Sequence, residues 1–321
     1  MPYFCLYINQ DDEIWYTFNK RLARNIVIRI IKKLYELPPK TTLRKIRNKL
    51  SGKDMSQYNL EEILHSEKFM RAANTVDFLS RIQAILKRHT SWVDLGFEGQ
   101  RVLEIGSGPL MGFGPLAVFL GCGEYVCMEP QFNRAVLQSK DLSEKYFLPL
   151  YKNLCALNGE RMTFDKFIML LQLKIFVEDK ELLQCEFANK FDIVLSKSYL
   201  EHIFPLDGSI KYLRNITREN VRFIHVVDFG NHMSTKNPFI HIYDNTPESF
   251  YKRFGKTINL YRPSDVMAIH ENNDFEVKMT PYYYFKEFYN KPLHSYWTER
   301  YNKEELFLKA VIFTDAIGSV S

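Results

Sequence analysis

The chain has few cysteines, and their spacing excludes several kinds of site. Only five occur among 321 residues, at positions 5, 122, 127, 155 and 185, and no two stand in the Cys-x-x-Cys spacing of zinc or redox motifs. An odd, scattered set of cysteines is typical of a protein from a reducing compartment. The sequence therefore argues against a disulfide scaffold, and we assign no metal-binding residues from it.

Long apolar segments are also scarce. The N-terminal stretch "MPYFCLYINQDDEIWY" lacks the basic start and apolar core of a signal peptide. One uncharged run, residues 105–123, is long enough to span a bilayer, but repeated glycines, Pro109 and Pro115 interrupt it. A turn followed by a short helix explains this run better than a membrane span does. We expect a soluble, cytoplasmic protein.

Positive charge gathers near the N-terminus. Residues 1–60 hold twelve Lys or Arg against five Asp or Glu, a local charge of +7, which leaves −2 for the rest of a chain whose net charge is +5. Residues 18–36 repeat apolar side chains at helical spacing opposite Arg21, Arg24 and Lys32. This basic amphipathic helix would pack on its own domain or a second subunit, or else meet anionic lipid or an acidic substrate.

Two domains are predicted. Residues 1–95 form a basic helical N-terminal extension, whose second helical region, about residues 60–88, should cover part of the main domain. Residues 96–321 alternate strand and helix signals, with short apolar runs at 102–105, 125–128, 174–177, 191–195 and 221–227. Such runs are typical of buried parallel strands joined by crossover helices.

The end of the chain completes the predicted sheet. Residues 274–280 and 305–314 read as two strands that could close it as an antiparallel pair, with an aromatic segment between them. We therefore expect an α/β fold with a doubly wound, mostly parallel, seven-stranded, Rossmann-like sheet. A helical insert at about 142–173 separates the second and third strands, and would either cover a ligand as a lid or lengthen the surface.

The stretch "RVLEIGSGPLMGFGPLAVFLGCGEYVCMEP", residues 101–130, predicts a strand, a glycine turn, a helix and a second strand that ends in an acid. Gly106 and Gly108 let a ligand approach the backbone closely, and the helix from about residue 114 begins near them with unpaired N–H groups. Glu129 is placed to accept both hydroxyls of a ribose. These features indicate a cofactor that contains a nucleoside.

The turn departs from a dinucleotide-binding loop. Such a loop reads Gly-x-Gly-x-x-Gly, and the third glycine position here is Met111. Glu104 precedes the first glycine by two residues, where it would repel a diphosphate and attract an ammonium or sulfonium group. The sequence therefore favours a cationic nucleoside cofactor.

These residues resemble the class I S-adenosylmethionine-dependent methyltransferases. The family's acid-x-Gly-x-Gly motif and the acid after its second strand correspond to "EIGSG" and "MEP", and "FDIVLSKSYLEHI" at 191–203 is similar to its fourth strand and the segment that follows. The match covers roughly residues 95–315. Leu110 replaces the family's third glycine, and the acid that follows the third strand stays unassigned among Glu178, Asp179, Glu181 and Glu186. The resemblance implies that S-adenosylmethionine is held by Glu104, Gly106, Ser107, Gly108, Pro109 and Glu129, with Ser196 nearby.

Candidates for binding and activating the methyl acceptor follow the fourth and fifth strands. His232 is the preferred general base, because an imidazole titrates near neutral pH, and Asp228 would orient it or bind the acceptor. His202, which matches the family's Leu-Glu-His, and His241 are candidate acceptor contacts. Residues 259–265 are similar to a stretch in a bacterial group of these enzymes from sugar and polysaccharide pathways, and there Arg262 would pair an acidic group.

The resemblance implies O-methylation of a sugar or another small polar hydroxyl compound, including a lipid-linked sugar. The segment after the fourth strand lacks the Asn/Asp-Pro-Pro-Tyr/Phe motif of amino-group methyltransferases, and the near-neutral catalytic region gives no support to a nucleic-acid substrate. Two alternatives stay open: a nicotinamide-dependent oxidoreductase on the same topology, and a non-catalytic protein that binds the cofactor or partners. Peripheral membrane contact through the N-terminal helix and oligomer formation are also open.

Overall fold

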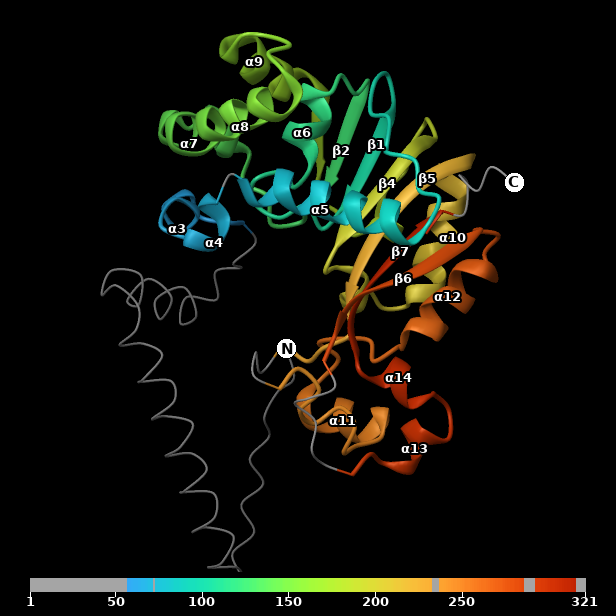
Figure 1. Ribbon diagram of the computed structural model, residues 1–321. Helices are drawn as coiled ribbons and strands as arrows, with labels where there is room; N and C mark the ends of the chain where they lie inside the picture. The colour runs from blue at the N-terminus through green and yellow to red at the C-terminus, as the bar shows by residue number, and fades with distance from the viewer. Residues whose placement is uncertain (1–56, 72, 233–236, 286–291, 316–321) are drawn as a thin grey trace, which may run out of the picture. The chain divides into compact units, whose positions relative to one another are not determined.

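The computed structural model describes residues 57–321, apart from residues 72, 233–236, 286–291 and 316–321 (Figure 1). The predicted basic helix at 18–36 lies outside the described residues. Its membrane or packing role and the domain division at residues 95 and 96 therefore stay predictions.

A seven-stranded sheet forms the centre of the described chain, in the order β3-β2-β1-β4-β5-β7-β6. The first five strands in this order are parallel, whereas β7 runs antiparallel to both β5 and β6. The predicted doubly wound, mostly parallel sheet with a closing antiparallel pair is confirmed. The strands are β1 (Arg101–Ile105), β2 (Glu124–Met128), β3 (Ile175–Glu178), β4 (Phe191–Lys197), β5 (Thr217–Asp228), β6 (Val277–Tyr284) and β7 (Leu308–Asp315).

The central strands are apolar on both faces because helices cover both sides of the sheet. Successive strand residues point to opposite faces, so Val102 of β1 joins one buried apolar cluster while Leu103 and Ile105 join another. Glu104 lies on the same side of β1 as Val102. The alternation thus places a carboxylate inside an otherwise apolar face.

The first cluster packs beneath helices α5 (Ala73–His89), α6 (Gly114–Phe119), α8 (Leu148–Asn158) and α9 (Phe164–Lys174). Val76, Leu79 and Leu86 recur along one side of α5 and are buried there, as the spacing of residues 60–88 predicts. Two short helices, α3 (Leu60–Leu64) and α4 (Glu67–Met70), precede α5, and Ile63 of α3 joins the same cluster. These three helices therefore share the core of the sheet.

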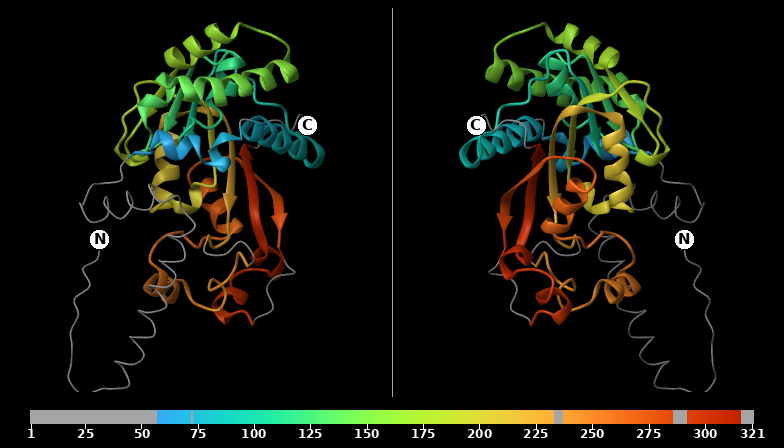
Figure 2. Two further views of the ribbon diagram at one scale, coloured as in Figure 1. Left: turned by 90° about the vertical axis from the view of Figure 1, so that its left-hand side faces the viewer. Right: turned by 90° about the vertical axis from the view of Figure 1, so that its right-hand side faces the viewer.

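The second cluster packs beneath α10 (Leu206–Ile216) and α12 (Pro263–Glu271). Figure 2 shows α10 against the sheet on the side away from α5. A third cluster lies among α11 (Pro247–Phe254), α13 (Ser295–Thr298) and α14 (Lys303–Leu306), with Trp297 fully buried at its centre.

The predicted insert is helical. It contains α7 (Lys140–Leu142), a π-helical turn at Ser143–Phe147, α8 and α9. Leu154 of α8 and Phe167 and Leu171 of α9 are buried in the first cluster, so these helices lie on the sheet rather than apart from it. Tyr146, in the π-helical turn, also lines the pocket described below.

Two strands begin later than their apolar patterns predict. The strand expected at 305–314 starts at Leu308, because the residues before it form the last turn of helix α14. The expected strand at 274–280 starts at Val277 instead, because Asp274 adopts a left-handed φ of 59° that turns the chain before it can extend. Tyr282, Tyr283 and Tyr284, predicted to lie between the last two strands, form the end of β6. Among the described residues, no helix is both long and apolar enough to cross a bilayer.

Candidate active site

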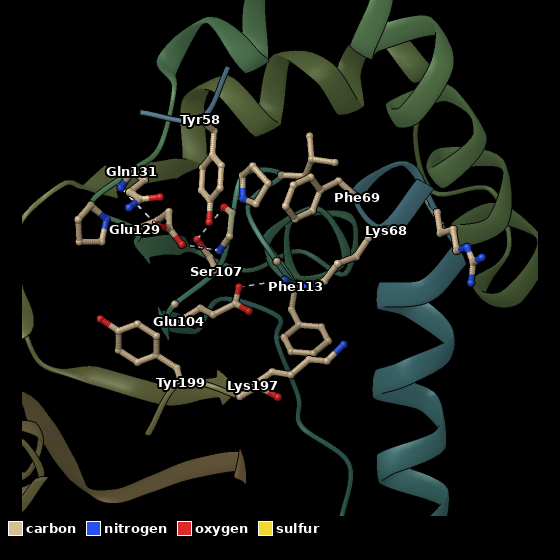
Figure 3. A pocket seen from close by; sticks show the side chains of 18 of the residues that line it. Tyr58, Lys68, Phe69, Glu104, Ser107, Phe113, Glu129, Gln131, Lys197 and Tyr199 are labelled. Carbon is tan, nitrogen blue, oxygen red and sulfur yellow. Dashed lines mark hydrogen bonds between the residues drawn. The ribbon is translucent and has the colours of Figure 1, made fainter. Parts of the chain in front are cut away.

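A pocket of about 760 Å³ opens at the carboxyl ends of β1, β2 and β4 (Figure 3). β1 lies between β2 and β4 in the sheet. The chain passes from β1 through β2 to β3 on one side and then crosses back to β4 on the other side of β1, and ligands of doubly wound sheets usually bind at this switch point. Each strand contributes the residues that follow it. The predicted residues that line the pocket are Glu104, Gly106, Ser107, Gly108, Pro109 and Glu129.

The loop after β1 needs glycine for two separate reasons. Gly106 and Gly108 both adopt left-handed φ values, 74° and 69°, which other residues reach only with strain. A Cβ on Gly106 would also collide with the ring of Tyr199, whereas a Cβ on Gly108 would meet no described atom within 4 Å. Gly106 therefore permits close packing within the protein, and Gly108 keeps the pocket open.

Glu129 holds this loop in place. One of its carboxylate oxygens, Oε2, accepts a hydrogen bond from the backbone N–H of Gly108 at 2.8 Å, and the other accepts one from the N–H of Gln131 at 3.3 Å. Burial raises the pKa of Glu129, while the two amide donors act against the rise. Both oxygens keep lone pairs that can accept further hydrogen bonds from a ligand.

Glu104 lies deeper in the pocket wall and is 2% exposed. Its carboxylate accepts hydrogen bonds from the N–H of Phe113 at 2.9 Å and from the hydroxyl of Tyr125 at 2.6 Å. Burial raises the pKa of Glu104 to about 7, although these donors and the charge of Lys197 lower it. The amide at the start of α6, predicted to be unpaired, thus serves Glu104, because the loop folds back over the acid.

Several residues that line the pocket are not among the predicted cofactor contacts. Lys197 ends β4 and Tyr199 follows it, within the stretch 191–203 that resembles the family's fourth strand, and this position is the signal that could have found them. The ammonium group of Lys197 lies 3.7 Å from the ring centre of Phe78, and burial lowers the pKa of this lysine. The other lining residues that were not predicted as contacts are Tyr58, Lys68, Phe69, Arg71, Leu110, Gly112, Phe113, Pro130, Gln131, Tyr146, Glu181 and Ser198.

Ser196 faces the core instead of the pocket. Its hydroxyl pairs with Nδ1 of His225 at 2.8 Å, and both residues are 2% exposed. Ser196 precedes the chain turn at the end of β4, where the lining begins with Lys197. Ser196 therefore directly precedes a residue that lines the pocket, but its own side chain is bound to His225 in the core.

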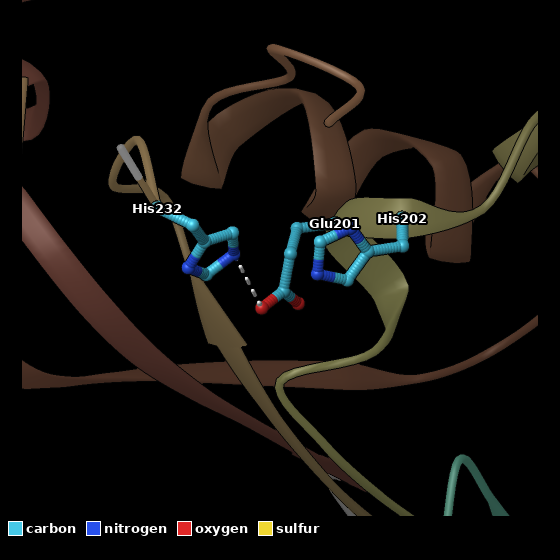
Figure 4. A group of neighbouring side chains, drawn as sticks. All are labelled: Glu201, His202 and His232. Carbon is cyan, nitrogen blue, oxygen red and sulfur yellow. Dashed lines mark ion pairs between the residues drawn. The ribbon is translucent and has the colours of Figure 1, made fainter. Parts of the chain in front are cut away.

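His232, the predicted general base, lies beside Glu201 and His202 (Figure 4). Nε2 of His232 is 3.8 Å from Oε1 of Glu201, and the two imidazole rings stack with their centres 5.0 Å apart. Burial lowers the pKa of His232, while the nearby charge of Asp228 raises it. His202 comes from the segment after β4 and His232 from the segment after β5, so the fold unites two histidines that the sequence separates.

Asp228 does not orient His232 by a hydrogen bond. Its Oδ2 forms an ion pair with Lys309 of β7, and its Oδ1 accepts a hydrogen bond from the N–H of Gly230. The acid within 4 Å of His232 is Glu201, the Glu of the Leu-Glu-His sequence, for which only His202 was predicted as a functional residue.

Arg262 and His241 lie away from the residues that line the pocket. Arg262 is 1% exposed, and its guanidinium donates to the carbonyls of Phe229 and Leu260 and to the hydroxyl of Tyr243. Its position suits a core residue better than the predicted pairing with an acceptor. His241 stacks on Phe254, with ring centres 5.1 Å apart.

No family model and no curated protein matches the sequence. In fold, the chain is similar to an S-adenosylmethionine-dependent methyltransferase from Mesorhizobium loti, with a TM-score of 0.41 and 11% identity over 74% of this chain and 96% of that chain. Magnesium protoporphyrin IX methyltransferase from Synechocystis PCC 6803 was solved with bound S-adenosylhomocysteine. It gives a TM-score of 0.38 and 11% identity, over 81% of this chain and 88% of that chain. Phosphoethanolamine N-methyltransferase 2 from Haemonchus contortus, in complex with S-adenosylmethionine, gives a TM-score of 0.39 and 14% identity, over 69% of this chain and 45% of that chain. These similarities concern the fold.

Proposed function

We propose that this protein is a class I methyltransferase that uses S-adenosylmethionine. The observation that carries the proposal is the position of two buried acids, Glu104 and Glu129, on either side of the Gly106–Gly108 loop at the carboxyl ends of β1 and β2. The two glycines have no Cβ atoms and admit a ligand close to the backbone, and carboxylates beside them select a ligand with hydroxyl donors and positive charge.

The residues fit the two ends of this cofactor. Glu129 would accept the hydroxyls of the ribose, since its oxygens have lone pairs beyond those used by Gly108 and Gln131. Glu104 would attract the ammonium or sulfonium charge of the methionine part. Lys197 and Lys68 line the same pocket and can attract its carboxylate. Glu104 would instead repel the diphosphate of a nicotinamide cofactor.

An acceptor site is supported by a second cavity of about 420 Å³. It shares Glu181 and Tyr199 with the cofactor pocket, and its other lining residues include His202, Gln184 and Phe204. A mixture of aromatic and polar side chains suits a small polar molecule such as a sugar. We propose that a hydroxyl of such a molecule accepts the methyl group, in the cytoplasm.

The bound cofactor supplies a methyl group that is activated by the positive sulfur. The protein must align the acceptor oxygen with this methyl group and remove the proton from the hydroxyl. His232 is the proposed base, because burial keeps it neutral and it lies next to His202 of the acceptor cavity. Asp228 would act on His232 only through its charge, since its carboxylate is bound by Lys309.

Calorimetric titration of the full-length protein with S-adenosylmethionine, S-adenosylhomocysteine and NADH tests the cofactor. We expect saturable binding of both adenosyl compounds and none of NADH. Binding of NADH alone, or of no ligand, would overturn the proposal. If the adenosyl compounds bind, radiolabelled methyl transfer to a panel of sugars, matched with amine and thiol compounds of similar size, tests the acceptor class.

A further inference from the structure

We infer that Glu201, His202 and His232 form a binding site for a divalent transition-metal ion of the Zn²⁺ type, beside the acceptor cavity. One donor atom from each residue lies within 4.8 Å of the others. Figure 4 shows the carboxylate of Glu201 between the two imidazole rings. The sequence assigns no metal ligand here, because the third member is separated from the other two by about thirty residues.

The first observation that points to a bound cation concerns the side chain of Glu201. The residue is 3% exposed, and neither of its carboxylate oxygens has a hydrogen-bond partner among the described residues. A buried carboxyl group without a hydrogen-bond partner is energetically unfavourable, and a bound cation would supply the missing partner. Its nearest basic atom is Nε2 of His232, which at 3.8 Å is too distant for a hydrogen bond but close enough to share an ion.

His202 is oriented as metal-binding histidines usually are. Its Nδ1–H donates a hydrogen bond of 2.7 Å to the carbonyl of Thr257, and a carbonyl can only accept. The proton therefore resides on Nδ1, and Nε2 keeps its lone pair for a ligand. A backbone carbonyl that fixes the second ring nitrogen in this way is typical of the partners found behind metal ligands.

The donor set selects the kind of ion. Two imidazole nitrogens and one carboxylate oxygen suit Zn²⁺ and related transition metals, whereas Mg²⁺ and Ca²⁺ prefer oxygen ligands alone. Donors around a tetrahedral Zn²⁺ stand roughly 3.4 Å apart, as its bond lengths of about 2.0–2.2 Å require. The separation of 3.8 Å between Nε2 of His232 and Oε1 of Glu201 is near this value, while the separations within the whole set extend up to 4.8 Å, so side-chain rotations that draw the three donors together are needed to surround the ion.

Three protein ligands leave a coordination position for an acceptor. His202 is exposed and the side chain of His232 is 44% exposed, so this position is accessible from solvent. The role of the ion rests on the proposed function: it would hold a hydroxyl oxygen of the acceptor and lower the pKa of that hydroxyl. In this arrangement His232 holds the ion in place of acting as the general base proposed above, and the hydroxyl proton would pass to solvent water, which reaches the exposed site.

Metal titration of the chelator-treated full-length protein tests the site without cofactor or acceptor. We expect one tight Zn²⁺ per chain by competition with a chromophoric chelator, a Co²⁺ complex whose visible absorption indicates four or five ligands, and no comparable binding of Mg²⁺. Glu201→Gln, His202→Gln and His232→Gln should each weaken Zn²⁺ binding by about 100-fold or more, since even partners behind the ligands contribute 10–100-fold. His89→Gln, at an exposed histidine on α5, is the matched control and should bind as the wild type does.

Two further results complete the test. Glu201→Gln keeps the shape of the side chain and removes the carboxylate that would bind the ion, so circular dichroism should show a folded protein. Unaltered Zn²⁺ affinity in this folded variant would overturn the inference. Glu129→Ala should weaken S-adenosylmethionine binding by roughly 10–100-fold and leave Zn²⁺ binding unchanged. Zn²⁺ binding without adenosyl binding would contradict only the proposed function, and the reverse pattern would contradict only the metal site.

Discussion

The backbone N–H of Gly108 donates a hydrogen bond of 2.8 Å to Oε2 of Glu129 across 21 residues of sequence. This contact joins the loop after β1 to the acid after β2, so the glycine turn and the carboxylate are held in one arrangement. A ligand that enters the pocket meets the open backbone and the acid together. Changes on either side of this contact should therefore alter ligand binding.

Replacing Glu129 with Ala should weaken S-adenosylmethionine binding by roughly 10–100-fold, because each hydrogen bond to a charged group contributes about 1.5–3 kcal/mol. Calorimetric titration measures the change. Glu98→Ala is the matched control, since Glu98 is exposed and precedes β1 at the opposite edge of the sheet. Equal affinity in Glu129→Ala and wild type would show that Glu129 only supports the loop.

Cofactor affinity should rise with pH between 6 and 8. In the ligand-free protein, burial raises the pKa of Glu104 to about 7, and a cationic ligand binds the ionised form better. With a pKa near 7, the ionised fraction falls roughly tenfold from pH 8 to pH 6, and the affinity should fall by about the same factor. Glu104→Gln should remove most of this dependence, and an unchanged pH profile in that variant would assign the dependence to another group.

The two loop glycines should respond differently to Ala. Gly106→Ala combines a left-handed φ with a collision against Tyr199, so we expect it to lower the free energy of unfolding by about 2–4 kcal/mol. Gly108→Ala should lower the free energy of unfolding by only about 1 kcal/mol, because it has the left-handed φ without a collision. Its methyl group would, however, occupy the pocket and weaken cofactor binding. Urea unfolding and ligand titration measure both effects. Equal losses of stability in the two variants would contradict this account.

Ser196→Ala should affect stability and leave cofactor affinity unchanged. The substitution removes the partner of Nδ1 in buried His225, at a cost of about 1–3 kcal/mol. Ser107→Ala is the matched variant, because Ser107 lines the pocket and its hydroxyl makes a long contact of 3.5 Å with the carbonyl of Gly108. If Ser196→Ala instead weakened binding without a loss of stability, the predicted role of Ser196 at the cofactor would be restored.

Much of the sheet and the first part of the pocket can be predicted from local pattern. Apolar runs locate the strands, and parallel strands bring their carboxyl ends to one edge of a sheet, so residues just after β1 and β2 must meet. Glu104, Gly106, Gly108 and Glu129 follow from this rule. Ser196 shows its limit, because a shift of one residue along a strand turns a side chain to the other face.

Contacts between distant segments escape such reasoning. Arg262 matches a stretch that suggested an acceptor contact, yet it is held in the core by Phe229, Leu260 and Tyr243. Glu201 stands beside His202 without any spacing that indicates a site. Its isolation from donors and its approach to His232 exist only once the segments after β4 and β5 are folded together.

The order of residues therefore accounts for the class of fold and for the glycine loop with its two acids, because both depend on periodicity and on neighbours within about thirty positions. Packing in three dimensions sets the pKa of Glu104, the partner of Asp228 and the grouping of Glu201, His202 and His232. Burial and charge act through space, so these properties arise from which segments meet and not from how far apart they lie along the chain.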